Sequence, residues 1–330
     1  MFRSLFSACA LLAHSWTTFA QYPLPLPCEG TCQDTHDPAL IQRTDGTWYR
    51  FATSNGISIY TAPEASGPWS YQGAVLPDCS VIDLPGNCDI WAADVTLVGN
   101  YYYLYYSVST LESQTSAIGV ATSEVLDAGS WFDHGSVIQS TPGLPYNTID
   151  PNLLVLPDGR PLLTFGSYWD GIFQTELNSD LPSGPLSTLA NAPINHLAMN
   201  VTWPHYIEGA YLYPSNGYYY LFFSSGLCCG YDNALPPPGE EYKIMVCRSE
   251  SPSGFFTDAN GVDCLQSGGT EILASHDFVY GPGGQSVYDV PGVGPVLVYH
   301  YADTRVGLAD REKFFGINYL DFSSGWPVVV

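Results

Sequence analysis

Apolar and polar residues follow one two-strand pattern five times along the chain. Each copy has a short apolar strand, a turn rich in Gly, Asp, Asn or Pro, and a second strand of aromatic and β-branched residues. The copies begin at Asp37, Ala93, Asp150, Glu208 and Gly284. This pattern predicts a β-hairpin in each copy.

The first four hairpins recur at a regular interval. Counted from Asp37, Asp94, Asp150 and Glu208, they lie 56 to 58 residues apart, which suits the four antiparallel strands of a propeller blade. The sequence lacks long helical periodicity, and its 32 glycines and 26 prolines suit many tight turns. We therefore predict an all-β fold, a five-bladed β-propeller. The alternatives are a β-sandwich, or two domains divided near residues 182–193.

The N-terminus has the pattern of a secretory signal. Arg3 precedes an apolar run over residues 5–13, and small residues end at Ala20. We predict that residues 1–20 are removed and that residues 21–330 form one secreted propeller domain. The apolar run is too short to span a bilayer, and no later stretch of eighteen apolar residues occurs, so we expect no membrane association.

Eight of the nine cysteines follow the predicted signal, an even number that favours disulfides in an oxidising compartment. Local spacing suggests three pairs and leaves two adjacent cysteines as a fourth: Cys28 with Cys32, Cys79 with Cys88, Cys247 with Cys264, and Cys228 with Cys229. A zinc site is the alternative, but paired histidines at finger-like spacing do not accompany these cysteines.

The formal charge of −23 includes Arg3, so the chain without its signal carries −24. Such an acidic surface is unfavourable for nucleic acid and for anionic lipid. Charged residues make up only 12% and aromatic residues 14%, a balance that suits stacking on neutral sugars, although acidity also solubilises secreted proteins. The sequon at Asn200 predicts a surface position.

The repeat predicts a cluster of carboxylates. The innermost strands of a propeller line its central channel, so Asp37, Asp94, Asp150 and Glu208 are expected around one pocket. Desolvation and mutual repulsion raise the pKa of at least one carboxyl group in such a cluster. A protonated acid beside an ionised carboxylate is the pair that hydrolyses glycosidic bonds. A single Asp-Pro is more simply a turn, but the recurrence favours catalysis.

Motifs along the whole chain after the signal resemble those of the endo-arabinanases of glycoside hydrolase family 43. In chain order they include HDPAL, DIWAADV, IDPNL, FGSYWDGI, IEGAYLY, YYYLFFSSGLCCGYD, YGPGGQSVYD and VLVYHYAD. The resemblance implies a five-bladed propeller that hydrolyses internal α-1,5 bonds of arabinan with inversion at the anomeric carbon. It implies arabinan as the partner and no cofactor for the chemistry; a monomer is the default for a secreted propeller.

By the same resemblance, Asp37 matches the general base, Glu208 the general acid and Asp150 a third carboxylate that orients the acid and tunes its pKa. Inversion needs about 6.5–9.5 Å between acid and base for a water. We expect Ile207 to help raise the pKa of Glu208 and Gly209 to let substrate approach. The prolines after Asp37 and Asp150 are expected to hold both aspartates in extended geometry.

Other motif residues are candidates for substrate contact. Trp91 and Trp169 are expected as sugar platforms, with core packing as the alternative, and Asn147 and Ser167 as polar contacts. Asp94 is interpreted as structural, because the family usually has proline in place of its neighbour Ala93.

Two further features come from the resemblance. Cys228 and Cys229 match an adjacent cysteine pair near the cleft, whose disulfide ring would present a flat apolar face; pairing elsewhere is the alternative. His300 matches a channel histidine that, in related enzymes, helps to hold a hydrated calcium or other ion. A lone histidine is more often a core residue, and water would have to supply most calcium ligands here. His36 is expected to form a hydrogen bond near Asp37.

Three rival functions stay open. The family also contains β-xylosidases and exo-acting arabinofuranosidases, which need a blocked pocket in place of an open groove. A carbohydrate-binding propeller without catalysis would keep the aromatic platforms. A fructan-cleaving enzyme on a related propeller would act with retention.

Overall fold

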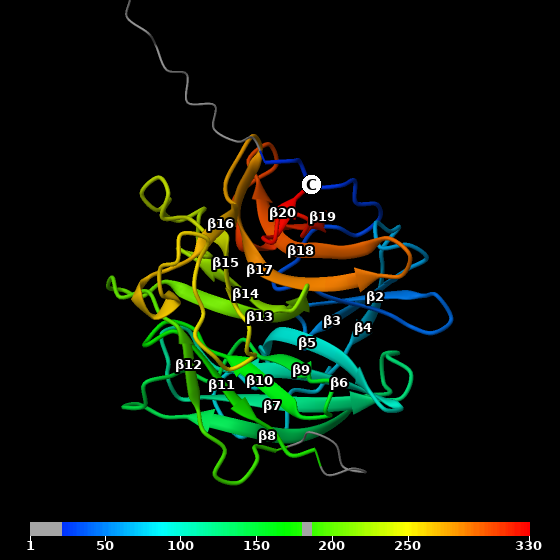
Figure 1. Ribbon diagram of the computed structural model, residues 1–330. Helices are drawn as coiled ribbons and strands as arrows, with labels where there is room; N and C mark the ends of the chain where they lie inside the picture. Colours follow the sequence, from blue (N-terminus) through cyan, green and yellow to red (C-terminus); the bar gives the residue numbers. More distant parts are fainter. Residues whose placement is uncertain (1–21, 180–186) are drawn as a thin grey trace, which may run out of the picture.

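The structure is a computed structural model that describes residues 22–179 and 187–330, so the predicted signal lies outside the described residues. Within this part, the chain forms twenty strands in five antiparallel sheets of four (Figure 1). Each sheet consists of four consecutive strands in sequence order, and we number the sheets as blades 1 to 5.

The strands have the following bounds. Blade 1 contains β1 (Ala39–Gln42), β2 (Trp48–Ala52), β3 (Ser58–Ala62) and β4 (Ser70–Ala74). Blade 2 contains β5 (Trp91–Val98), β6 (Tyr101–Val108), β7 (Ser116–Ser123) and β8 (Phe132–Ser140). Blade 3 contains β9 (Asn152–Val155), β10 (Pro161–Phe165), β11 (Ile172–Glu176) and β12 (Asn195–Ala198). Blade 4 contains β13 (Ile207–Ser215), β14 (Tyr218–Ser225), β15 (Lys243–Ser249) and β16 (Thr270–Leu273). Blade 5 contains β17 (Val279–Val290), β18 (Gly294–Asp303), β19 (Phe314–Asp321) and β20 (Val328–Val329). Two short 3-10 helices, η1 (Cys264–Gln266) and η2 (Asp310–Glu312), lie in loops of blades 4 and 5.

The blades form a closed ring. Their first strands β1, β5, β9, β13 and β17 contact one another in a complete cycle. Among the described residues, five buried apolar clusters are found, and each lies between two neighbouring blades. The predicted five-bladed β-propeller is therefore confirmed, and the β-sandwich alternative is wrong. A domain boundary at residues 182–193 would divide blade 3, because β11 and β12 belong to the same sheet.

Position within a blade explains the residue pattern. The inner strands β2 and β10 are buried at every position, because a neighbouring blade covers each face, and they are accordingly rich in apolar residues. The outer strand β8 alternates between exposed and buried residues, as a half-covered strand does. Tight turns join the inner strands: Asn216 and Gly217, both with positive φ, form the two-residue loop between β13 and β14, the arrangement that suits a hairpin.

The segment before β1 joins the first blade to the last. The amide of Leu26 donates to the carbonyl of Ile317 at 2.9 Å, and the amide of Phe315 donates to the carbonyl of Cys32 at 2.8 Å. This connection brings Asp37 to the axis beside blade 5.

All eight cysteines after the predicted signal are paired in disulfides. The four pairs are those predicted from spacing, so the zinc alternative is wrong. Among the described residues, no helix has the length and apolar character needed to cross a membrane.

Candidate active site

Each blade places a residue with a left-handed backbone in its first strand or just before it, facing the propeller axis. The five, with their φ angles, are Asp37 (44°), Ala92 (49°), Asp150 (56°), Gly209 (62°) and Gly284 (57°). All five line one hollow on the propeller axis. The expectation of extended geometry at Asp37 and Asp150 is therefore wrong. Aspartate tolerates this conformation better than most residues, and the turn aims both carboxylates off the strand and into the hollow.

The register predicted for blades 2 and 4 needs correction. Ala92, not Asp94, is the counterpart of Asp37 in blade 2, and Gly209, not Glu208, in blade 4. Both first strands are irregular there, since the pairing shifts between Trp91 and Asp94 and again after Glu208. Such bulges re-aim side chains near functional sites. They cannot be read from residue spacing alone.

Asp94 joins blade 2 to blade 3. Its Oδ2 accepts a hydrogen bond from the amide of Leu153 at 2.8 Å, and its Oδ1 accepts one from Asn152 Nδ2 at 3.4 Å. Burial raises the pKa of Asp94 to about 7, against both hydrogen bonds. These contacts occupy the carboxylate and agree with the structural interpretation of this residue.

A ring of hydrogen bonds between blades holds the left-handed residues. In four of these five residues, the backbone N–H donates to a side chain of the preceding blade. That side chain lies near the end of the second strand of its blade. The pairs are Ala92 to Thr53 Oγ1 (2.8 Å), Asp150 to Ser107 Oγ (2.9 Å), Gly284 to Ser224 Oγ (2.9 Å) and Asp37 to His300 Nδ1 (3.1 Å). His300 thus plays the part that a hydroxyl plays in three other blades. It is the acceptor that closes the ring between blades 5 and 1.

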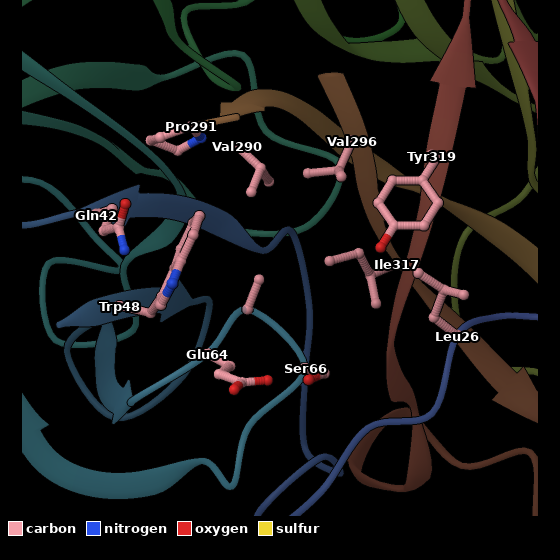
Figure 2. A pocket seen from close by; sticks show the side chains of 11 residues that line it. Leu26, Gln42, Trp48, Glu64, Ser66, Val290, Pro291, Val296, Ile317 and Tyr319 are labelled. Carbon is pink, nitrogen blue, oxygen red and sulfur yellow. The ribbon is translucent and has the colours of Figure 1, made fainter. Parts of the chain in front are cut away.

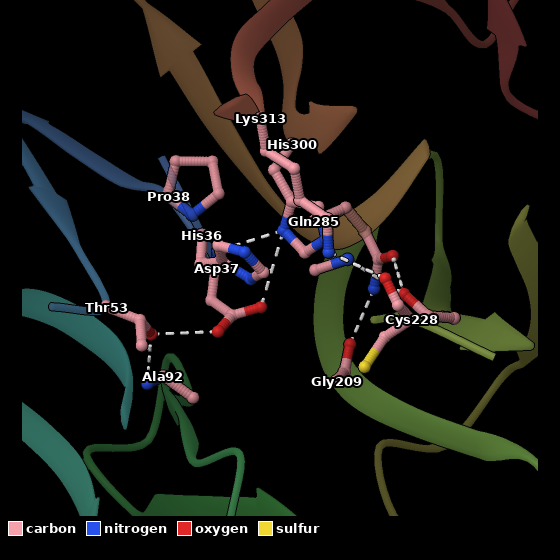
Figure 3. A network of polar contacts seen from close by, with 12 residues as sticks. His36, Asp37, Pro38, Thr53, Ala92, Gly209, Cys228, Gln285, His300 and Lys313 are labelled. Atoms are coloured by element: carbon pink, nitrogen blue, oxygen red, sulfur yellow. Dashed lines mark hydrogen bonds and ion pairs between the residues drawn. The ribbon is translucent and has the colours of Figure 1, made fainter. Parts of the chain in front are cut away.

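Asp37 is held between two blades (Figure 3). Its Oδ2 accepts a hydrogen bond from Thr53 Oγ1 at 2.8 Å, and its Oδ1 lies 3.6 Å from His300 Nδ1. Burial raises the pKa of Asp37, while the hydrogen bond from Thr53 and the positive charge of Lys313 oppose this effect. The side chain is still 29% exposed, so solvent reaches it. Asp37 is suited to hold a water and to take a proton from it.

Glu208 lies in β13, directly before Gly209, which lines the hollow. Its Oε2 accepts a hydrogen bond from Ser167 Oγ at 2.5 Å, and its Oε1 accepts one from the Tyr242 hydroxyl at 2.8 Å. Burial raises the pKa of Glu208, and the charge of Asp37 adds to this; the two hydrogen bonds and Lys313 act in the opposite direction. The raised pKa favours the protonated form that an acid catalyst needs.

Asp150 connects to Glu208 through the backbone. Its Oδ2 accepts a hydrogen bond from the amide of Gly209 at 3.1 Å, so it holds the peptide that follows Glu208. Burial, then the charges of Glu208 and Asp37, raise the pKa of Asp150 well above its usual range. Space around Gly209 is adequate, because an added Cβ would meet Ser224 Oγ only at 3.7 Å. A glycine at position 209 instead suits the left-handed backbone in which the Gly209 amide donates to Asp150.

The predicted substrate residues fall into two groups. Ser167 and Asn147 are buried and have partners within the protein, Glu208 for the first and Ser140 for the second. Trp91 and Trp169 are half-buried. The Cys228–Cys229 disulfide is also partly accessible, since Cys229 is exposed.

Sequence reasoning missed Thr53, Tyr242 and Lys313. Thr53 donates a hydrogen bond to Asp37 within blade 1, and Tyr242 donates one to Glu208 within blade 4. Lys313 lies 3.1 Å from Asp310 Oδ1 and donates to the carbonyl of Cys228 in blade 4. Hydroxyls and lysines carry no motif of their own, so only the fold identifies them.

His36, Asp37 and His300 form a group whose potential ligand atoms lie within 4.8 Å of one another. The group does not fit the hydrated calcium that the resemblance implies. His300 Nδ1 accepts the Asp37 N–H, so the proton of the neutral ring is on Nε2, which has no partner among the described residues. His36 Nε2 lies 3.1 Å from the carbonyl of Asp310. One His36 nitrogen and one carboxylate are few ligands for an ion that takes six to eight, mainly oxygens.

A second hollow, of about 310 Å³, lies elsewhere, at the seam between blades 1 and 5 (Figure 2). Its walls include Trp48 from β2, Val296 from β18 and Tyr319 from β19, and Glu64 is its one carboxylate. We place the candidate active site in the smaller hollow on the axis, because acid–base hydrolysis needs more than one carboxyl group.

Gly284 offers a direct test of the axial geometry. An added Cβ would lie 2.3 Å from Asp37 Oδ1 and 2.7 Å from the His300 ring. We therefore expect Gly284→Ala to displace Asp37 and to lower kcat/KM about a hundredfold. Gly99→Ala is the matched control, because Gly99 has a similar φ of 62° with nothing within 4 Å. Steady-state kinetics on both variants checks this, and equal losses would contradict it.

Known proteins resemble the chain over nearly its full length. The sequence model of glycosyl hydrolases family 43 matches residues 31–327. Arabinan endo-1,5-alpha-L-arabinosidase A of Aspergillus aculeatus is 54% identical over 311 residues, 93% of this chain and 94% of that protein. An exo-1,5-alpha-L-arabinanase from a bovine ruminal metagenomic library superposes with a TM-score of 0.80 at 30% identity, covering 92% of this chain and 99% of the other. An alpha-L-arabinanase of Cellvibrio cellulosa, in complex with arabinohexaose, has a TM-score of 0.78 at 28% identity, covering 91% and 96%. With an axial cluster of carboxylates in a five-bladed propeller, this chain belongs to glycosyl hydrolases family 43.

Proposed function

We propose that this chain is a secreted, inverting endo-arabinanase that cleaves internal α-1,5 bonds of arabinan. The observation that carries the proposal is the axial cluster, in which Asp37 and Asp150 line one hollow and Glu208 is joined to it through Gly209. The names of the relatives supply the substrate, because the arabinosidase of Aspergillus aculeatus is an arabinan endo-1,5-alpha-L-arabinosidase.

The reaction uses three carboxyl groups in different roles. Ionised Asp37 takes a proton from a water, whose oxygen attacks the anomeric carbon. Protonated Glu208 gives its proton to the glycosidic oxygen as the bond to it breaks. Asp150 orients the backbone of Glu208 through the Gly209 amide. Because the water attacks from the side opposite the leaving sugar, the product has inverted configuration.

Context supports the remaining parts of this proposal. Four disulfides suit an oxidising compartment, as does the predicted signal at residues 1–20. We further propose that residues 21–330 form a single catalytic domain that acts as a monomer, with Trp91, Trp169 and the Cys228–Cys229 ring as substrate contacts.

The first experiment separates endo cleavage from its rivals. We expect purified protein to release short oligomers at once from linear arabinan, with no release from xylan. Arabinose alone, released from chain ends, would instead indicate an exo enzyme, which the likeness to an exo-arabinanase keeps as the second candidate. Binding without turnover would indicate a carbohydrate-binding protein.

Proton NMR during the first minutes tests the stereochemistry. We expect the newly formed reducing ends to appear first as the β anomer and to equilibrate later. An α anomer as the first product would contradict the roles of Asp37 and Glu208, and would point to retention.

A further inference from the structure

A buried lysine lies beside the carboxylates and has no part in the proposed reaction. Lys313, directly after η2, has a side chain that is 0% exposed. Its Nζ donates to the carbonyl of Cys228 at 2.6 Å and lies 3.1 Å from Asp310 Oδ1. Two oxygen acceptors favour the charged ammonium over the neutral amine. Burial lowers the pKa of Lys313, and the ion pair with Asp310 offsets part of this effect.

The ammonium is close to the residue that precedes Asp37, because Asp310 Oδ1 lies 3.1 Å from Lys313 Nζ and 3.9 Å from His36 Nε2. It attracts both Asp37 and Glu208. Burial lowers the pKa of His36 and of His300, and the charge of Lys313 lowers both further. In the view of Figure 3, Lys313 and His300 are both drawn above Asp37. Burial otherwise opposes ionisation of Asp37, and a base must be ionised to act.

The position of Lys313 makes the nearby group of His36, Asp37 and His300 unfavourable for a divalent cation. A cation held by His36, Asp37 and His300 would face the repulsion of Lys313, since the lysine acts electrostatically on all three side chains. His300 Nδ1 is also occupied as the ring-closing acceptor. Two independent features, the donor set and the nearby ammonium, therefore disfavour a metal here.

We propose that Lys313 supplies the positive charge beside Asp37 that a bound metal ion would otherwise supply, so that this chain works without a metal. Lys313 acts as a positioning residue: it does not touch substrate, but it stabilises the ionised carboxylate of Asp37. This inference rests on the proposed role of Asp37. The metal content and the melting temperature that test it can be measured without any enzymatic activity.

The first test uses the wild-type protein. We expect the metal content after dialysis to be well below one ion per chain, and the melting temperature and kcat/KM to be unchanged by EDTA or by added Ca²⁺. A stoichiometric metal, or a melting temperature that falls with EDTA and recovers with Ca²⁺, would overturn the proposal. Metal content and melting are measurable even if arabinan proves not to be the substrate.

The second test uses a neutral replacement of similar length. We expect Lys313→Met to lower kcat about ten- to a hundredfold, with KM changed much less because the side chain is inaccessible to substrate. Unchanged kcat with a lower melting temperature would mean a merely structural lysine.

Arg50→Met is the matched control. Arg50 is also fully buried, in β2, but its guanidinium lies over the rings of Tyr60, Trp69 and Phe315. We expect this variant to lose stability and to keep its kcat. Equal loss of kcat in both variants would show that any buried cation produces the effect, and would contradict a specific role for Lys313.

His300→Asn separates the two roles of the histidine. Asparagine Oδ1 can take the place of Nδ1 as acceptor for the Asp37 amide, whereas leucine cannot. We expect His300→Asn to melt several degrees above His300→Leu, both with and without EDTA. Equal melting of the two variants would contradict the ring-closing role.

Discussion

Replacing Glu208 by glutamine is expected to abolish hydrolysis of arabinan, with a loss in kcat of at least about a thousandfold. Glutamine keeps the shape, and its carbonyl oxygen can accept from one of the two hydroxyls while its NH2 donates to the oxygen of the other. It has no acidic proton to give to the leaving sugar. Reducing-sugar release from linear arabinan measures the loss, and a variant with more than a tenth of the wild-type rate would contradict the assignment.

A substrate with a good leaving group identifies which step is lost. A nitrophenyl group leaves without a proton, so we expect Glu208→Gln to regain most of its activity on a nitrophenyl arabinotrioside.

The pH profile gives a second criterion for the role of Glu208. Burial raises the pKa of Glu208, so the acid is protonated below this pKa and wild-type activity falls as pH rises through it. We expect this alkaline fall to disappear in Glu208→Gln on the activated substrate.

The second large effect is expected at the base. Asp37→Asn keeps the left-handed backbone conformation and an acceptor for Thr53, but it removes the group that takes the proton from water. We expect a loss in kcat of about a thousandfold or more on arabinan and on the nitrophenyl substrate alike. Recovery on the activated substrate would mean that Asp37 does not act on the water.

Asp94→Asn is the matched control for Asp37→Asn. Both carboxylates line the axial hollow, yet Asp94 is occupied by Leu153 and Asn152. An asparagine retains an acceptor for the Leu153 amide. We expect this variant to keep at least a tenth of the wild-type rate. A loss as large as that of Asp37→Asn would show that Asp94 has a chemical role.

The sequence was sufficient for the architecture because strand periodicity and turn chemistry are local properties. Five hairpins can be recognised from their residues, and the loop at Asn216-Gly217 has the residue pair that such turns prefer. The disulfides were also predictable, since three of the four pairs join cysteines fewer than ten residues apart. Even so, counting from one hairpin to the next placed Asp94 and Glu208 in the wrong register, because a bulge adds residues without changing the pattern.

What the sequence determined by itself was the all-β propeller, the family resemblance and the identity of Asp37, Asp150 and Glu208 as candidates. Only the tertiary structure decided how these residues are used. The left-handed turns, the acceptor role of His300 and the position of Lys313 each depend on contacts between blades far apart in sequence. Burial and charge act through space, so the pKa of a carboxyl group follows from the neighbours that folding gives it.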